Sequence, residues 1–317
     1  MDEFKLIQYI KKTFSSKFIG DDTAFINNSQ INLISKDILI EDIHFVIKNN
    51  LFEIGAKSLI SNLSDILASG GKPLFFFLGL GIPSYLNDFQ IKSLLDGLKK
   101  ISQKYNVKLA GGDISSAPKL FISITITGST IKKIPVNRCG AESGDNIFVT
   151  GNLGDSEIGL RIILNQLTIT CAKVKEYFIK KHYFARLYPD FVKTLCLKSK
   201  INSMIDISDG FLQDLSHILD CSKKSAEISA KAIPKSENFK KLKKVLKNDY
   251  LKIPLFSGEE YQLIFTTPES LEKIKKISKK FKVKISKVGV ITEKRNEKIK
   301  ILDMFEKMEN LGYRHFS

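Results

Sequence analysis

The segment of residues 204–210 constrains the fold more than any other, because an apolar run there ends abruptly in carboxylates and a glycine. It reads Met-Ile-Asp-Ile-Ser-Asp-Gly, and beyond Gly210 apolar residues recur at the spacing of an α-helix. The pattern predicts a buried strand that passes through a glycine turn into a helix. Side chains on such a turn can converge on a ligand, which makes Asp206, Ser208 and Asp209 candidate site residues. The alternative is that Ser208 or Asp209 caps the helix and that Asp206 is solvated.

Strand-like and helix-like segments follow one another along the whole chain without strict alternation. The first half combines helical spacing at residues 56–67 and 91–101 with strand-like runs at residues 75–80, 107–110 and 120–128. Around residues 132–137 the apolar pattern lapses, so we expect one domain at residues 1–135 and a second at residues 136–317. The mixture favours an α+β architecture with two domains over a doubly wound sheet.

The composition narrows the class of partner. A net charge of +16 could indicate a nucleic-acid ligand, but the lysines are spread over the whole chain. The richest run, residues 235–252, alternates with apolar residues like the wet face of an amphipathic helix, so we expect no nucleic-acid partner. No apolar run reaches the roughly 20 residues that span a bilayer, so we expect no membrane partner either.

The four cysteines show no metal-binding or redox spacing. Cys139, Cys171, Cys196 and Cys221 lie far apart, with no CxxC pair and no nearby histidine at zinc spacing. They are typical of thiols in a reducing compartment, and the expected location is the cytoplasm.

Six acidic positions share a local setting, because most of them follow an apolar segment or lie beside a glycine. They are the pair Asp21 and Asp22, Asp37, Asp65, Asp113, Asp155, and the pair Asp206 and Asp209. In one cleft these carboxylates would repel one another unless cations neutralised them, and Mg²⁺ prefers such oxygen ligands together with substrate phosphates. The alternative for each aspartate is an ordinary turn or helix start.

Familiar catalytic motifs are missing from the sequence. It contains no GxxxxGK[ST] loop, no GxGxxG and no nucleophile with a fixed histidine partner. Phosphoryl transfer needs mainly positioning and charge neutralisation, which scattered carboxylates and glycine-rich turns can supply. The acids therefore predict a metal-nucleotide site.

An ordered set of motifs points to a family. It includes Asn-Leu-Ser-Asp at residues 62–65 and Gly-Gly-Asp at residues 111–113, and the full set lies at residues 20–22, 37–45, 62–65, 111–113, 138–145, 149–156, 205–210 and 258–261. In this order the motifs resemble the thiamine-monophosphate kinase family, whose superfamily also contains aminoimidazole ribonucleotide synthetase and selenophosphate synthetase. Within the superfamily, His44, the Gly258-Glu259-x-Tyr261 motif and the closing Gly312-Tyr313 favour the kinase.

The resemblance implies an enzyme that transfers the γ-phosphoryl group of ATP to thiamine monophosphate, giving thiamine diphosphate by direct in-line attack without a catalytic base. By position, several Mg²⁺ ions would be held by Asp22, Ser35, Asp37, Asp65, Asp113, Asp206 and Asp209. ATP would contact Gly112, Asp113, Arg138 and Ser208, and thiamine phosphate would contact His44, Glu259 and Tyr313. A carboxylate and an aromatic face also suit a cationic heterocycle on physical grounds.

The resemblance carries an expectation about architecture as well. The N-terminal domain should be a mixed sheet with helices on one side, pairing with a second copy in a homodimer, and the C-terminal α+β domain should complete the active-site cleft. An exposed apolar sheet face, such as residues 121–126 could supply, would be consistent with that dimer.

The chain departs from the family pattern at several positions, and two rivals stay open. Lys36 stands where the family usually has a hydroxyl residue, and Ile114 replaces a usual threonine, but every carboxylate assigned to metal is in place. The nearer rival is another ATP-dependent enzyme of the superfamily acting on a purine precursor, which should not need Glu259 and Tyr313. The more distant rival is a basic nucleic-acid-binding protein, which should not depend on Asp37 or Asp206.

Overall fold

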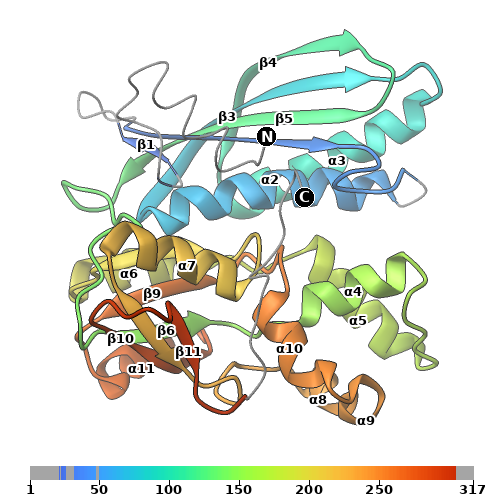
Figure 1. Ribbon diagram of the computed structural model, residues 1–317. Helices are drawn as coiled ribbons and strands as arrows, with labels where there is room; N and C mark the ends of the chain where they lie inside the picture. Colours follow the sequence, from blue (N-terminus) through green and yellow to red (C-terminus); the bar gives the residue numbers. More distant parts are fainter. Residues whose placement is uncertain (1–20, 22, 26–31, 48–49, 305–317) are drawn as a thin grey trace.

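A computed structural model describes residues 21, 23–25, 32–47 and 50–304, and it contains two mixed sheets with helices packed between and beside them (Figure 1). The first sheet has the order β1-β2-β5-β3-β4, in which only β3 and β4 are parallel. This part comprises β1 (Ala24–Phe25), β2 (Leu33–Ile40), α2 (Leu51–Ala68), β3 (Gly71–Ile82), α3 (Asp88–Tyr105), β4 (Lys108–Ser116) and β5 (Phe121–Thr130). The predicted α+β class is therefore confirmed.

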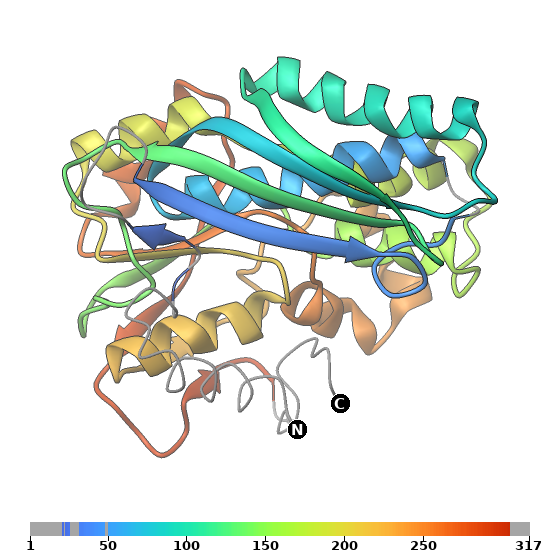
Figure 2. The ribbon, with the colours of Figure 1, turned by 90° about the horizontal axis from the view of Figure 1, so that it is seen from above.

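Helix α2 is the central element of the molecule. It begins where the Asn50 side chain accepts a hydrogen bond from the Phe52 backbone N–H, and most of its residues are buried. Seen from above, the strands of the first sheet cross over it (Figure 2), and in Figure 1 it separates that sheet from the C-terminal part. Helix α3 packs closely against α2 because Gly55 has no side chain. A Cβ atom at this position would overlap the backbone carbonyl of Leu94 on α3.

The C-terminal part is built on a second sheet with the order β11-β8-β10-β6-β9-β7. Its elements are β6 (Asn146–Thr150), α4 (Asp155–Ile163), α5 (Ala172–Tyr183), α6 (Pro189–Lys198), β7 (Ser203–Asp206), α7 (Phe211–Ser222), β8 (Ser225–Ile228), α8 (Glu237–Lys241), α9 (Lys243–Leu246), α10 (Asp249–Phe256), β9 (Leu263–Thr267), α11 (Leu271–Lys279), β10 (Ile285–Thr292) and β11 (Ile299–Ile301). The strand and helix predicted on either side of residues 207–210 are β7 and α7.

Two expectations about surface segments are wrong. The lysine-rich run forms α8, α9 and α10 instead of one amphipathic helix, and Lys247, between α9 and α10, has a left-handed φ of 46° that ends α9. The isoleucines of residues 121–126 are buried against the core and do not form an exposed face. The large apolar side chains that the structure shows exposed on the first sheet are instead Ile38, Phe77, Leu109 and Ile114.

Strand β4 is an edge strand whose residues are exposed along its whole length, with Ile114 68% exposed. Gly112 and Asp113 lie on this strand. An unpaired edge beside apolar side chains is a ready template for association with another chain.

Two of the cysteines are joined. Cys139 and Cys221 form a disulfide with their Cα atoms 4.9 Å apart, whereas Cys171 and Cys196 are free. Among the described helices, none combines the length and the apolar character that crossing a bilayer requires.

Candidate active site

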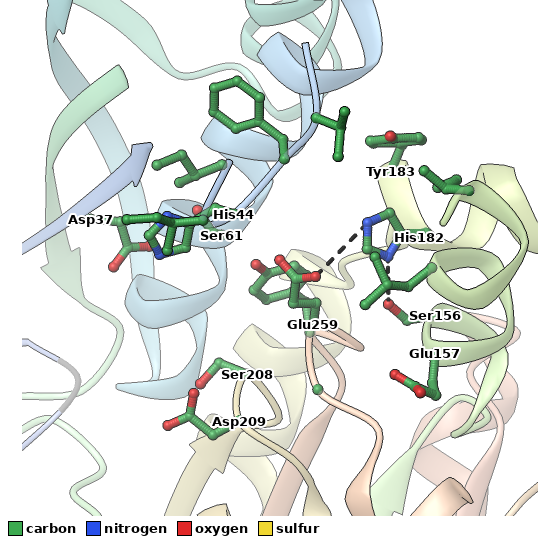
Figure 3. Close-up of a pocket in the computed structure, with 18 of the residues that line it drawn as sticks. Asp37, His44, Ser61, Ser156, Glu157, His182, Tyr183, Ser208, Asp209 and Glu259 are labelled. Atoms are coloured by element: carbon green, nitrogen blue, oxygen red, sulfur yellow. Dashed lines mark hydrogen bonds and ion pairs between the residues drawn. The ribbon is translucent and has the colours of Figure 1, made fainter. Parts of the chain in front are cut away.

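A cleft of about 610 Å³ brings together residues that are distant in sequence. Of the predicted site residues it is lined by Asp37, His44, Asp65, Asp206, Ser208, Asp209 and Glu259. In Figure 3, Asp37 and His44 lie on one side, Ser156 and His182 lie on the other, and Glu259 lies between them. Side chains from the N-terminal and C-terminal halves of the chain thus face the same cleft.

The remaining predicted residues have other positions. Ser35 does not line the cleft, and its hydroxyl donates a hydrogen bond to the Asp65 carboxylate. Gly112 and Asp113 lie on β4 and do not line the cleft of their own chain, and neither does Arg138. Asp22 and Tyr313 lie outside the described residues.

The turn after β7 and the loop before β9 are held together through their backbones. The Glu259 N–H donates to the Ser208 carbonyl at 2.7 Å, and the Tyr261 N–H donates to the Ile207 carbonyl at 2.8 Å. Glu259 and Tyr261 have φ values of 54° and 50°, a left-handed conformation that residues with side chains seldom adopt. Such local strain is typical of functional sites, and here it fixes Glu259 beside Ser208.

Asp214 organises the turn at the start of α7, and it is not among the site residues predicted from the sequence. Its Oδ2 accepts hydrogen bonds from the backbone N–H groups of Ser208, Asp209 and Gly210, each at 3.1 Å. The N-cap residue of α7 is Gly210, so neither Ser208 nor Asp209 occupies the capping position that the alternative gave it. The available signal was an acid in the first turn of the predicted helix, where the helix dipole favours it.

The carboxylates of the cleft are close enough to affect one another. Burial and the charges of Asp209 and Asp206 raise the pKa of Asp214 well above its ordinary range. Burial likewise raises the pKa of Tyr261, and the carboxylates of Glu259, Asp37, Asp206 and Asp65 add to the effect. Of the acids singled out in the sequence, Asp37, Asp65, Asp206 and Asp209 thus converge on one volume, as predicted for them.

The donor atoms of the cleft fit hard divalent cations. Four of the five aspartates that line it, Asp37, Asp65, Asp206 and Asp209, offer with the Ser35 hydroxyl the oxygen ligands that Mg²⁺ prefers. Within the described part of the chain, no lysine or arginine lines the cleft, although the protein carries a net charge of +16. A phosphate entering this cleft would therefore need cations as partners.

Asp155 does not belong to this group. It is buried away from the cleft and accepts hydrogen bonds from Ser236 at 2.7 Å and Tyr177 at 2.8 Å. It therefore links α4 to α5 and to the start of α8, and the expectation that it shares the acidic cleft is wrong.

Arg138 lies close enough to the start of α7 for its charge to act on Asp214 and His217. Its backbone N–H donates to the Asp21 carboxylate at 3.0 Å. Burial and the Arg138 charge lower the pKa of His217 to about 4. Among the described residues, the one compact group of metal-type ligands is Asp209, Asp214 and His217, within 4.8 Å of one another.

Because His182 is buried in its neutral form, we expect the protein to lose stability measurably in acid. It is 2% exposed, and burial together with Lys57 lowers its pKa to about 3. Below pH 6.5 the unfolded chain takes up a proton that the folded chain refuses, so stability present above pH 6.5 falls by about 1.4 kcal/mol per pH unit towards pH 3. Urea unfolding at about pH 7 and pH 5 should show a steeper decline for the wild type than for His182→Gln. Parallel declines would contradict this account.

The chain is similar to known proteins over nearly its whole length. Residues 20–130 match the AIR synthase related protein N-terminal domain, and residues 142–301 match the corresponding C-terminal domain. The thiamine-monophosphate kinase of Buchnera aphidicola (subsp. Acyrthosiphon pisum, strain APS) is 35% identical over 92% of this chain and 91% of its own. That of Bacillus subtilis (strain 168) is 32% identical over the full length of both chains.

A solved structure extends the likeness to three dimensions. It is described as "AaThiL complexed with AMPPCP and TMP", has a TM-score of 0.88 and is 32% identical, covering 99% of this chain and 97% of its own. Sequence identity above 30% over nearly the whole length, both domain matches and the shared fold lead to one conclusion. The chain belongs to the thiamine-monophosphate kinase family.

Proposed function

We propose that this protein transfers the γ-phosphoryl group of ATP to thiamine monophosphate, giving ADP and thiamine diphosphate. The observation that carries the proposal is the cleft that brings Glu259 together with Asp37 and with the turn that carries Ser208 and Asp209. The similar solved structure is described as a complex with AMPPCP and TMP, and AMPPCP is an analogue of ATP. This likeness supports ATP and thiamine monophosphate as the two substrates.

The residues have distinct tasks in this proposal. Asp37, Asp65, Asp206 and Asp209, with the hydroxyl of Ser35, would hold several Mg²⁺ ions, and Asp22 and Asp113 remain proposed members of this set. When bound, Mg²⁺ neutralises the phosphate oxygens that the acidic wall would otherwise repel. The acceptor phosphate is already ionised at neutral pH, so no side chain has to remove its proton.

The rest of the site would orient the two substrates. Gly112, Arg138 and Ser208 would contact ATP, whereas His44, Glu259 and Tyr313 would contact thiamine phosphate. The His44 Nδ1 accepts a hydrogen bond from the Ile40 N–H at 3.0 Å, so a neutral His44 carries its proton on Nε2 and can donate it to a phosphate. Apolar side chains of the cleft wall, including Ile43, Leu160 and Phe256, would exclude water from the organic part of the substrate.

The direct test is product formation by the purified protein. ATP, Mg²⁺ and thiamine monophosphate are supplied together and singly omitted, while ADP release and thiamine diphosphate are followed by chromatography. Diphosphate that requires all three supports the proposal. If the protein bound ATP but formed no thiamine diphosphate, it would act on the acceptor of another enzyme of the superfamily. If it did not bind Mg-ATP, the proposed metal-nucleotide site would be wrong.

Glu259→Gln should weaken the acceptor substrate selectively. The variant loses the negative charge that would face the cationic thiazolium ring of thiamine monophosphate, which removes about 2 kcal/mol of binding free energy. The KM for thiamine monophosphate should therefore rise roughly 30-fold. The KM for ATP should stay within about twofold, because Glu259 is not proposed to contact ATP. Glu157→Gln is the matched control, since Glu157 lines the same cleft but pairs with Arg161 at 2.7 Å. Equal effects of the two variants would contradict the role of Glu259.

We also propose a homodimer that uses the exposed edge of the first sheet. Three strand spacings, roughly 14 Å, separate β4 from β2, so a metal site that uses both Asp113 and Asp37 needs β4 from a second copy. Light scattering should give twice the 35.8-kDa mass of the chain, and Ile114→Lys should shift it towards the monomer. A monomeric wild type would exclude this assembly.

A further inference from the structure

Beneath Glu259 lies a lysine with no exposed surface. Lys57, on α2, is 0% exposed, and its Nζ is 2.5 Å from Glu259 Oε1 and 3.1 Å from His182 Nε2. A buried ammonium is costly unless an opposite charge compensates it. The charge of Lys57 is therefore tied to that of Glu259, whose side chain remains 29% exposed to the cleft.

The direction of the hydrogen bonds around His182 follows from chemistry. An ammonium can only donate, so His182 Nε2 must accept from Lys57, and the imidazole proton must reside on Nδ1. From Nδ1 it is donated to the Ser156 hydroxyl, at 3.2 Å. His182 is neutral, as its lowered pKa of about 3 requires, so it orients the Lys57 ammonium without competing for its counter-charge.

We propose that Lys57, oriented by His182, is a positioning residue that keeps Glu259 ionised and directed into the cleft to recognise a cationic substrate. The proposal rests on the function proposed above and adds the residue on which its acceptor specificity depends. Lys57 occupies Oε1, which leaves Oε2 to meet the ligand, and Oε2 is 3.8 Å from His182 Nε2.

Among the described residues, the charge of Glu259 is affected by Lys57 from α2, His182 from α5 and His44 from the loop after β2, and Glu259 in turn acts on Tyr261 of its own loop. Burial acts to raise the pKa of Glu259, but Lys57 first, and then His182 and His44, outweigh it and bring the pKa below its ordinary value. Without Lys57 the burial of Glu259 is opposed much less, and the carboxyl should take up a proton at a higher pH.

The experiment compares Lys57→Met with Lys119→Met. Lys119 also pairs with a carboxylate of the cleft, Asp42 at 2.8 Å, but both partners are 55% exposed. Carbon-13 NMR follows the titration of the Glu259 carboxyl in the protein without substrate, with Glu259→Gln as the assignment standard. Lys57→Met should move this titration to higher pH, and Lys119→Met should leave it unchanged.

Kinetics should report the same change at the acceptor site. At about pH 6, Lys57→Met should lower kcat/KM for thiamine monophosphate about tenfold, and the deficit should shrink as rising pH ionises Glu259. The KM for ATP should stay unchanged. A purely structural role for Lys57 would instead lower activity towards both substrates at every pH.

His182 supplies a conservative rescue. Gln can accept from Lys57 and donate to Ser156, so His182→Gln should keep the wild-type titration of Glu259. His182→Leu can do neither and should shift the titration in the direction of Lys57→Met. Equal titrations in these two variants would remove His182 from the proposal.

The stability of the variants towards urea provides a further check, because it is measured without substrate. Glu259→Gln leaves the Lys57 ammonium buried without its counter-charge and should lower the urea midpoint, whereas Lys57→Met in the same chain should restore it. The proposal is overturned if Glu259 titrates alike in the wild type and Lys57→Met. Failure of the wild type to form thiamine diphosphate would reject the proposed function alone, because the titration needs no substrate.

Discussion

Asp37→Asn is expected to lower kcat about a thousandfold while the protein stays folded. Asp37 lies on β2, lines the cleft and acts electrostatically on the buried Tyr261 together with Asp206 and Asp65. Replacing a carboxylate by an amide of the same size removes one charge from the proposed Mg²⁺ ligands. Losing one group that stabilises transition-state charge costs two to three orders of magnitude, and a metal ligand belongs at the upper end.

The fold should survive this change because the backbone of Asp37 is held independently of its side chain. Its N–H donates to the Asn62 side chain at 3.3 Å, and β2 pairs with β5 along its whole length. Initial rates of thiamine diphosphate formation at saturating ATP measure kcat, and urea unfolding measures stability.

Asp42→Asn is the matched control for Asp37→Asn. Asp42 lines the same cleft, but its carboxylate is exposed and paired with Lys119 at 2.8 Å. Its left-handed φ of 66° is one that asparagine adopts readily, so the backbone is not disturbed. This variant should keep kcat within about twofold. Full activity of Asp37→Asn would show that the carboxylate does not serve the reaction.

Local patterns were enough to predict the strand and helix at residues 203–222. The switch from an apolar run to helical spacing reflects which faces are buried, and that information lies within a few residues of sequence. The same holds for the acids that follow apolar segments or lie beside glycines, four of which, Asp37, Asp65, Asp206 and Asp209, line one cleft. The assignment of each acid to a metal stays a prediction.

The Lys57 and His182 pair could not be predicted in this way. The two residues are separated by 125 positions and meet only because α2 passes beneath the first sheet and against α5. Lys57 stands on a helix that also carries Glu53 and Asp65, and sequence alone cannot distinguish a buried ammonium there from one that reaches solvent.

Net charge was equally uninformative about the site. The chain carries +16, yet the described lining of the cleft is acidic, with Glu157 and Glu259 beside its aspartates. Composition sums over the whole surface, whereas the field in a cleft depends on the few side chains that line it.

Asp214→Ala is expected to cost about 3 kcal/mol of unfolding free energy and to lower kcat about a hundredfold. Its carboxylate accepts from three consecutive backbone N–H groups at the start of α7, and it is 2% exposed. Removing it leaves the Gly210 N–H buried without an acceptor and frees two more, each a loss of about 1 kcal/mol or more. The turn that carries Ser208 and Asp209 would then lose its support, so both groups would be misplaced.

Two variants distinguish this support from a general effect of acids on α7. Asp220→Ala removes a carboxylate from the same helix, but Asp220 is 59% exposed and pairs with Lys298 at the surface, so it should cost less than about 1 kcal/mol. Asp214→Asn keeps one oxygen that can accept the backbone N–H groups, so its stability and kcat should lie between those of Asp214→Ala and the wild type. Urea unfolding and initial rates decide the order. If Asp214→Ala were as stable as Asp220→Ala, the three hydrogen bonds would not hold the turn, and the position of Asp209 would need another cause.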